Sequence, residues 1–106
     1  MTDNRQHERH ELSIDVEVTS GDQSLAGSSK DISIGGMKLE MPRDTDPLRP
    51  GMRLEVAFRL PELRDEIRVP ALVRWTDRID PHIGGVQFLR GLRAREVWAI
   101  DRMRRD

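Results

Sequence analysis

Hydrophobic and polar residues alternate along several short stretches of the chain, as they do in β-strands that bury one face. The cleanest stretch is residues 52–60, in which every second residue is a large apolar one. The same alternation predicts strands over residues 12–19 and 67–75, and weaker or shorter ones over residues 23–34, 37–41 and 86–88. Six short strands with turn signals about every 8 to 12 residues predict a small antiparallel barrel.

The period of the apolar residues changes after Gly91. Leu92, Val97, Ile100 and Met103 share one face of a helix, and most arginines of this stretch point away from that face. A helix over residues 91–105 is therefore expected to cap the barrel. Trp98 is expected to pack against the barrel or against a partner.

The predicted fold class is mainly β, with a six-stranded antiparallel barrel followed by a C-terminal α-helix. A chain of 106 residues has room for one domain and one modest core. The single domain is expected to comprise a flexible polar arm over residues 1–10, the barrel over residues 11–89 and the helix. Only four residues are aromatic, so the core is expected to be aliphatic.

Composition restricts the location and the chemistry of the protein. No apolar run approaches the roughly 20 residues that a membrane-spanning helix needs, and the first residues are too polar for a secretory signal. We therefore expect a cytoplasmic protein without a membrane span. The chain has no cysteine, which excludes disulfides, thiolate metal sites and cysteine nucleophiles.

The charge distribution argues against a general binder of nucleic acids. The formal net charge is −1, whereas polyanion binders usually carry a clear excess of base. Residues 84–106 are locally positive, however, because they hold six arginines against three acidic residues. A barrel that binds single-stranded nucleic acid through this end is therefore a possible but less favoured function.

The candidate metal and catalytic motifs lack either the required spacing or the required partner residues. His7 and His10 are three residues apart, whereas the zinc-protease helix motif needs two histidines at i and i+4. Asp44 and Asp46 lack the additional oxygens of a calcium loop, and Ser33 has no evident histidine and acid partners. We therefore predict no enzyme activity, no metal and no cofactor.

Two polar motifs remain without a purely structural explanation when they are taken together. Arg5 and Arg9 are four residues apart just before the first strand. Their guanidinium groups can bind phosphates or stack on bases. Asp31 and Ser33 would face one side of an extended segment, where a carboxylate can accept hydrogen bonds from the N1 and N2 donors of guanine. Gly35 and Gly36 would allow a left-handed or bulged backbone and a close approach of the ligand.

Each motif also has an ordinary explanation. The two arginines are also typical of a solvated arm, and "DISIGG" is also typical of a turn in which side chains bond to nearby backbone. The combination, in this order on a small barrel, nevertheless resembles the PilZ family, whose pattern is RxxxR before the first strand and (D/N)xSxxG about twenty residues later. "PALVRW" and "GGVQF" further along the chain are also similar to that family.

The resemblance implies a PilZ-type barrel that binds the bacterial second messenger cyclic di-GMP. Arg5 and Arg9 would grip phosphates and stack on guanine, and Asp31, Ser33 and Gly36 would line the surface that reads the base. Many relatives carry an arginine where this chain has Asn4. That position is associated with whether one ligand molecule or a stacked pair is held, and Asn4 favours one molecule or weaker binding of the pair.

Trp75 is a further residue with two possible roles. Its position continues the alternating face of Val69, Ala71 and Val73, which favours packing in the core or at the rim of the barrel; stacking on a base is the alternative. The resulting hypothesis is a receptor in which the ligand orders the arm and an unidentified protein partner reads the new surface. The main alternative is a PilZ-fold interaction module that does not bind nucleotide.

Overall fold

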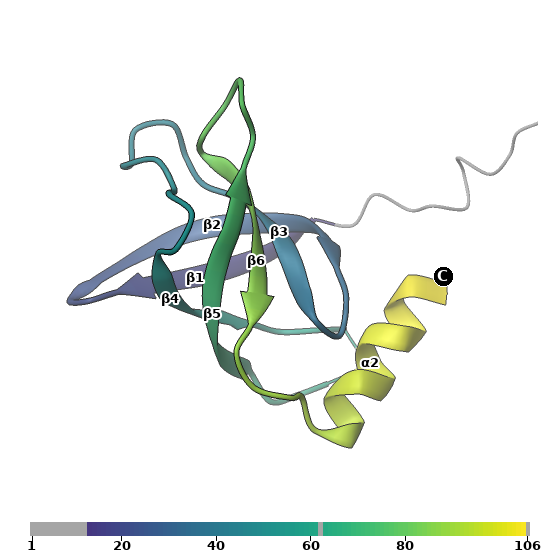
Figure 1. The fold of residues 1–106 in the computed structure, drawn as a ribbon. Coiled ribbons are helices and arrows are strands. Elements are labelled where there is room, and N and C mark those ends of the chain that lie inside the picture. Colours follow the sequence, from purple (N-terminus) through teal and green to yellow (C-terminus); the bar gives the residue numbers. More distant parts are fainter. Residues whose placement is uncertain (1–12, 62, 106) are drawn as a thin grey trace, which may run out of the picture.

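The computed structural model describes residues 13–61 and 63–105. Within them, six strands form a closed barrel, and one helix follows (Figure 1). The elements are β1 (Ile14–Ser20), β2 (Gln23–Ile32), β3 (Gly36–Glu40), β4 (Arg53–Phe58), β5 (Ile67–Thr76), β6 (Ile83–Phe88) and α2 (Ala94–Arg105). The predicted fold class is thus confirmed. The order around the barrel is β1-β2-β3-β6-β5-β4, and every neighbouring pair is antiparallel.

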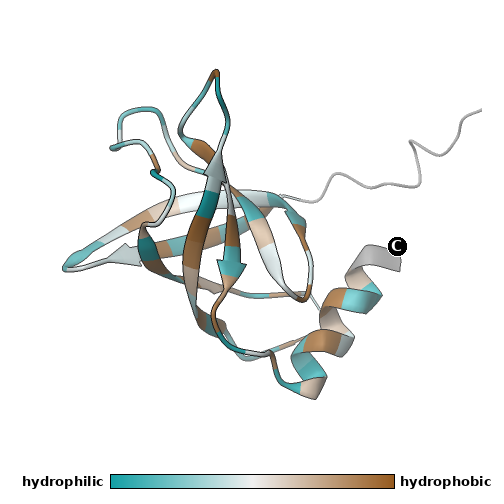
Figure 2. Ribbon diagram, in the orientation of Figure 1, coloured by the Kyte–Doolittle hydropathy of each residue, from teal (hydrophilic) through white to brown (hydrophobic). Residues whose placement is uncertain are grey.

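The barrel interior is filled from the alternating apolar residues that predict the strands. Along β4 and β5, hydrophobic residues alternate with polar ones (Figure 2). Val56, Val69 and Leu39 are completely buried, and Phe58 stacks on Phe88 with 6.2 Å between ring centroids. The core is aliphatic apart from this one aromatic pair within the described residues. Burial of this apolar surface is the main force that closes the sheet.

The helix α2 starts at Ala94, three residues later than expected. The backbone N–H of Arg93 donates to the carboxylate of Glu96 at 2.8 Å, so Glu96 satisfies a donor that the first helical turn leaves open. This bond explains why Glu96 is buried despite its charge. Ala99, Ile100 and Met103 pack into the core, whereas Trp98 stays half exposed under the guanidinium of Arg102.

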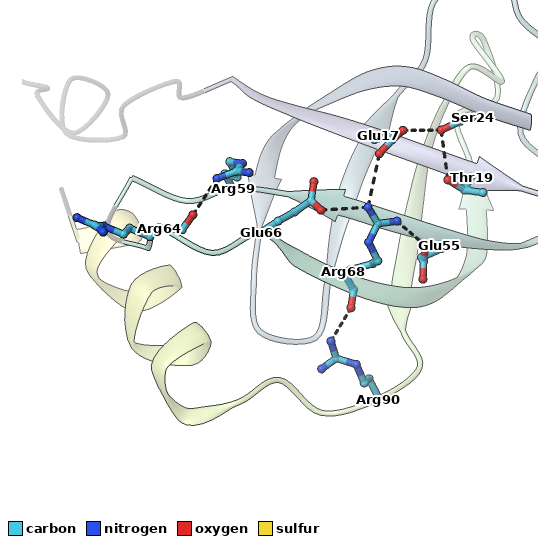
Figure 3. Close-up of polar contacts among 9 residues, drawn as sticks. All are labelled: Glu17, Thr19, Ser24, Glu55, Arg59, Arg64, Glu66, Arg68 and Arg90. Carbon is cyan, nitrogen blue, oxygen red and sulfur yellow. Dashed lines mark hydrogen bonds and ion pairs between the residues drawn. The ribbon is translucent and has the colours of Figure 1, made fainter.

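One arginine links the outer surfaces of three neighbouring strands (Figure 3). Arg68 of β5 lies 2.9 Å from Glu55 of β4, 3.0 Å from Glu66 and 3.8 Å from Glu17 of β1. Hydrogen bonds to Glu55 and Glu66 raise the pKa of Arg68, because both bonds favour the charged guanidinium. The side chain of Arg90 donates to the backbone carbonyl of Arg68 and so ties the segment before α2 to the barrel.

A second polar cluster fixes the loop after β3 against the hairpin between β5 and β6. Asp80 accepts hydrogen bonds from the backbone N–H of His82 at 3.1 Å and from the side chain of Arg43 at 3.1 Å. The Nε2 of His82 lies 2.8 Å from the carbonyl oxygen of Thr45. The hydrogen bond from the backbone of His82 is the main reason that the pKa of Asp80 lies below its ordinary value.

Ionised Asp80 is therefore expected to stabilise the fold in a pH-dependent way. Because its pKa is lower in the folded chain, its contribution is present above the ordinary carboxyl pKa of 3.8 and is lost as the pH falls through the folded-state pKa. Asp80→Asn keeps an acceptor oxygen but removes the charge. Thermal unfolding at pH 7 and pH 3 should show a lower melting temperature for this variant at pH 7 and a smaller difference at pH 3. A difference that does not change with pH would contradict this account.

Candidate functional site

A transverse row of outward-facing residues crosses four strands of the barrel. The register pairs Trp75 of β5 with Gly85 of β6, Gly85 with Lys38 of β3, and Lys38 with Asp31 of β2. The side chains of Trp75, Lys38 and Asp31 are exposed. Residues that are far apart in the sequence thus meet on one outer surface because directly opposed residues in a sheet share a face.

An irregularity at each end of this row turns its terminal residue outward. The register shifts between Ser29 and Asp31 in β2 and between Val73 and Trp75 in β5. A bulge inserts one residue, so the next side chain changes face. Without these shifts, Asp31 and Trp75 would continue the buried positions of Ser29 and Val73.

The expected placement of Trp75 on the buried face of β5 is therefore wrong. Its side chain is 47% exposed and lies on the outer face, because the alternation that placed it with Val69, Ala71 and Val73 breaks at Arg74. The indole of Trp75 packs directly on the backbone of Gly85. A Cβ at Gly85 would overlap ring atoms of Trp75, so only glycine lets the ring lie against the sheet. The outer face of the ring remains available for stacking.

The segment from Ser33 to Gly36 is a tight turn between β2 and β3. The backbone N–H of Ser33 donates to the carbonyl of Gly36 at 2.8 Å, and the Ser33 hydroxyl lies 3.3 Å from the same carbonyl. The N–H of Gly35 donates to the Ser33 hydroxyl at 3.3 Å. Ser33 therefore holds the turn through nearby backbone. Ile34, expected within a strand, is instead 55% exposed in this turn.

The glycines of the turn do not act through a left-handed backbone, which corrects that expectation. Among the described residues, only Gly21 and Gly51 have positive φ. Gly36 is needed for a different reason: a Cβ there would overlap the carbonyl oxygen of Val86 in the adjacent strand β6. Gly36 thus permits close pairing of β3 with β6. Gly35 has open space around its Cβ position.

This difference predicts opposite outcomes for two adjacent substitutions. Gly36→Ala must push β3 away from β6 and is expected to lower the free energy of unfolding by about 1–3 kcal/mol, as overpacking does. Gly35→Ala meets no atom within 4 Å and is expected to change it by less than about 0.5 kcal/mol. Urea denaturation of both variants measures the contrast. Equal effects would show that the close approach to Val86 is not limiting.

A depression of about 330 Å³ lies over the row. It is lined by Asp31, Ser33, Gly35, Gly36 and Trp75, all of which were predicted as definite or possible site residues. Lys38, Arg74 and Gln87 also line it and were missed. The pairing register that brings Lys38 and Gln87 here depends on long-range contacts, so no local pattern identifies them. Arg74 lies in "PALVRW", the stretch already noted as similar to the PilZ family.

The charges of the depression suit an anionic ligand with polar edges. Among the residues that the structure describes, the Asp31 carboxylate and the cationic groups of Lys38 and Arg74 make no ion pair or hydrogen bond with another side chain. Charged groups held side by side without partners are available to a ligand. Trp75 adds a flat apolar surface beside them.

A larger groove of about 850 Å³ lies elsewhere, along β1, β2 and β4 and next to Met103. It holds none of the predicted site residues, and its charged lining is mainly acidic: Asp15, Glu17 and Glu66, with Arg59. Carboxylates repel phosphates, and the side chain of Arg59 is bonded to the carbonyl of Arg64 at 2.8 Å. The smaller depression is therefore the better candidate for a nucleotide.

Several predicted features lie outside the described residues. These are Asn4, Arg5 and Arg9, the remainder of the arm, and the pair His7 and His10. Residues 13–61 and 63–105 contain no group of three or more potential metal-ligating side chains. No helix in that part of the chain is long and apolar enough to cross a membrane.

Comparison with known proteins identifies the family. The sequence matches the family model described as the PilZ domain over residues 3–103, a range that includes both polar motifs. The chain belongs to the PilZ domain family. PilZ domains are receptor and adaptor modules, and the family is known for binding cyclic di-GMP. The family predicted from the two motifs is thereby confirmed.

Solved structures with the same fold include two PilZ neighbours. One is the PilZ domain of CeSA from a cellulose-synthesizing bacterium, with a TM-score of 0.60, 18% identity and coverage of 90% of this chain and 92% of that one. The other is the Bacillus subtilis inhibitor of motility MotI/DgrA, with a TM-score of 0.69, 20% identity and coverage of 95% of this chain but only 50% of that one. No curated protein sequence matches this PilZ chain.

Proposed function

We propose that this PilZ domain is a receptor for cyclic di-GMP and that the depression over β2, β3, β5 and β6 holds a guanine base of the ligand. The observation that carries the proposal is the placement of Asp31 and Trp75 at the two ends of one outward row. Both side chains are exposed there by bulges, which cost ladder pairing. Membership in the PilZ family supports the same ligand.

Each residue of the depression would have a separate role in recognising guanine. The Asp31 carboxylate accepts hydrogen bonds from the N1 and N2 donors of the base, which adenine does not offer in that arrangement. The indole of Trp75 stacks on the base. Ser33 and Gly36 act indirectly, since they hold the turn and the pairing of β3 with β6 that position Asp31.

The arm supplies the remaining contacts in this proposal. Arg5 and Arg9 grip the phosphates and stack on the ligand, and Asn4 in place of arginine favours one ligand molecule. Binding orders the arm across the depression, and a protein partner reads the changed surface. The domain itself acts without enzymatic chemistry, and we place it in the cytoplasm.

Calorimetric titration of the full chain tests this function. We expect saturable binding of cyclic di-GMP, with one ligand per chain, and much weaker binding of cyclic di-AMP and of a short single-stranded oligonucleotide. Arg9→Ala is expected to remove binding of cyclic di-GMP without unfolding the chain. Absence of heat with cyclic di-GMP would favour a protein-interaction module. Salt-sensitive oligonucleotide binding that survives Asp31→Ala would favour a nucleic-acid function.

A further inference from the structure

Two cations outside the two polar motifs border the depression. Lys38 lies in the middle of the transverse row, directly opposite Asp31 in the pairing of β2 with β3. Arg74 is the inserted residue of the β5 irregularity and directly precedes Trp75. Both side chains are exposed and line the depression together with Asp31 and Trp75.

These cations differ from arginines that serve the fold. Arg68 joins three carboxylates, Arg43 lies 3.1 Å from Asp80, and Arg95 lies 3.2 Å from Asp65. Within the described part of the chain, Arg74 and Lys38 have no carboxylate within ion-pair distance. Lys38 and Asp31 form no ion pair with each other, although they lie directly opposite on the adjacent strands β3 and β2. Their charges are therefore not used to hold the barrel together.

A ligand with phosphates needs such cations at this place. The Asp31 carboxylate, which can read the guanine edge, also repels a nearby phosphate. Lys38 and Arg74 outnumber this carboxylate and lie on the same surface, so the local field of the barrel favours an anion. A guanidinium can hold a phosphate through two parallel hydrogen bonds, and an ammonium acts as a point charge.

We propose that Arg74, assisted by Lys38, anchors a phosphate of the ligand on the barrel itself, in addition to the arginines of the arm. This inference rests on the proposed binding of cyclic di-GMP. The bulge in β5 then has two effects: it exposes Trp75 to stack on the base, and it places the phosphate anchor next to that base. The barrel surface thereby contacts both a guanine and its phosphate.

The test compares how variants of the full chain bind cyclic di-GMP, which carries phosphates, and guanosine, which carries none. Arg74→Gln is expected to weaken binding of cyclic di-GMP by roughly ten- to a hundredfold in calorimetry, as loss of a charged hydrogen bond does. Lys38→Gln is expected to have a smaller effect in the same direction. Arg78→Gln is the matched control, because Arg78 is exposed on the same hairpin but does not line the depression. Its affinity should equal that of the wild type.

Guanosine, which has no phosphate, separates anchoring from an indirect effect. Titration followed by the NMR signal of the Trp75 indole N–H should give the same guanosine affinity for Arg74→Gln and the wild type. An equal loss for guanosine and cyclic di-GMP would mean that Arg74 acts by positioning Trp75 and would overturn the anchor. Unchanged affinity for cyclic di-GMP in Arg74→Gln would also overturn it while leaving the proposed function intact. If the wild type does not bind cyclic di-GMP, both proposals fail.

Discussion

Asp31→Ala is expected to weaken binding of cyclic di-GMP by about a hundredfold or more. The substitution removes two charge-assisted hydrogen bonds to one guanine edge and leaves the N1 and N2 donors of that base without an acceptor, and each such loss weakens binding strongly. The barrel should stay folded, because Asp31 is exposed and its side chain makes no hydrogen bond or ion pair within the described region. Calorimetry measures the affinity, and thermal unfolding verifies that the fold is retained.

Asp15→Ala is the matched control for this substitution. Asp15 is also an exposed carboxylate on a strand, but it lines the larger groove and not the depression. Its removal changes the net charge of the chain by the same amount. An equal effect of both substitutions would mean that Asp31 acts through overall charge, and an unchanged affinity of Asp31→Ala would show that the site is wrongly assigned.

Trp75→Ala is expected to weaken binding of cyclic di-GMP by roughly ten- to a hundredfold, the range that loss of one base-stacking contact produces. Trp75→Phe should keep part of this affinity because phenylalanine still offers a flat face. Stability should change little, since Trp75 is half exposed on the outer surface and packs mainly over Gly85. Calorimetry of both variants gives the comparison.

Trp98→Ala provides the control with the same residue type and similar exposure. Trp98 is 49% exposed on α2, against 47% for Trp75, and its ring lies 5.3 Å from the guanidinium carbon of Arg102. We expect its removal to leave the affinity for cyclic di-GMP unchanged. If Trp98→Ala reduced the affinity as much as Trp75→Ala, the ligand would contact α2 and the proposed location would be wrong.

The barrel could be predicted from the sequence because its strands bury one face. Alternation over residues 52–60 and 67–75 corresponds to β4 and β5, and the change of period after Gly91 corresponds to α2. The boundaries were less accurate. β2 ends at Ile32 because Ser33 starts a tight turn, and α2 starts at Ala94 because Glu96 satisfies the N–H of Arg93.

The candidate site could be predicted only in part. Asp31, Ser33 and Gly36 follow a local motif, so their positions in the sequence identify them. The outward direction of Trp75 depends on a bulge in β5, and alternation alone gives the opposite face. Lys38 lies opposite Asp31 because β2 pairs with β3, and opposite Gly85 because β3 pairs with β6. Such long-range register is not encoded in any short stretch of sequence.

The roles of the glycines also required the structure. A glycine pair in a sequence usually suggests a turn with unusual backbone angles. Here Gly36 allows close contact with β6, and Gly85 provides space for the indole of Trp75. Gly36 and Gly85 thus shape the site through the absence of a side chain, and neither of them has a positive φ.

The fluorescence of Trp75 tests the central claim most directly, because the chain has only two tryptophans. In Trp98→Phe, Trp75 is the single emitter. We predict that cyclic di-GMP quenches or shifts its emission, that the change saturates at the stoichiometry found by calorimetry, and that cyclic di-AMP at the same concentration has little effect. Calorimetric binding of cyclic di-GMP without any change in the emission of Trp75 would contradict a guanine stacked over the row from Trp75 to Asp31.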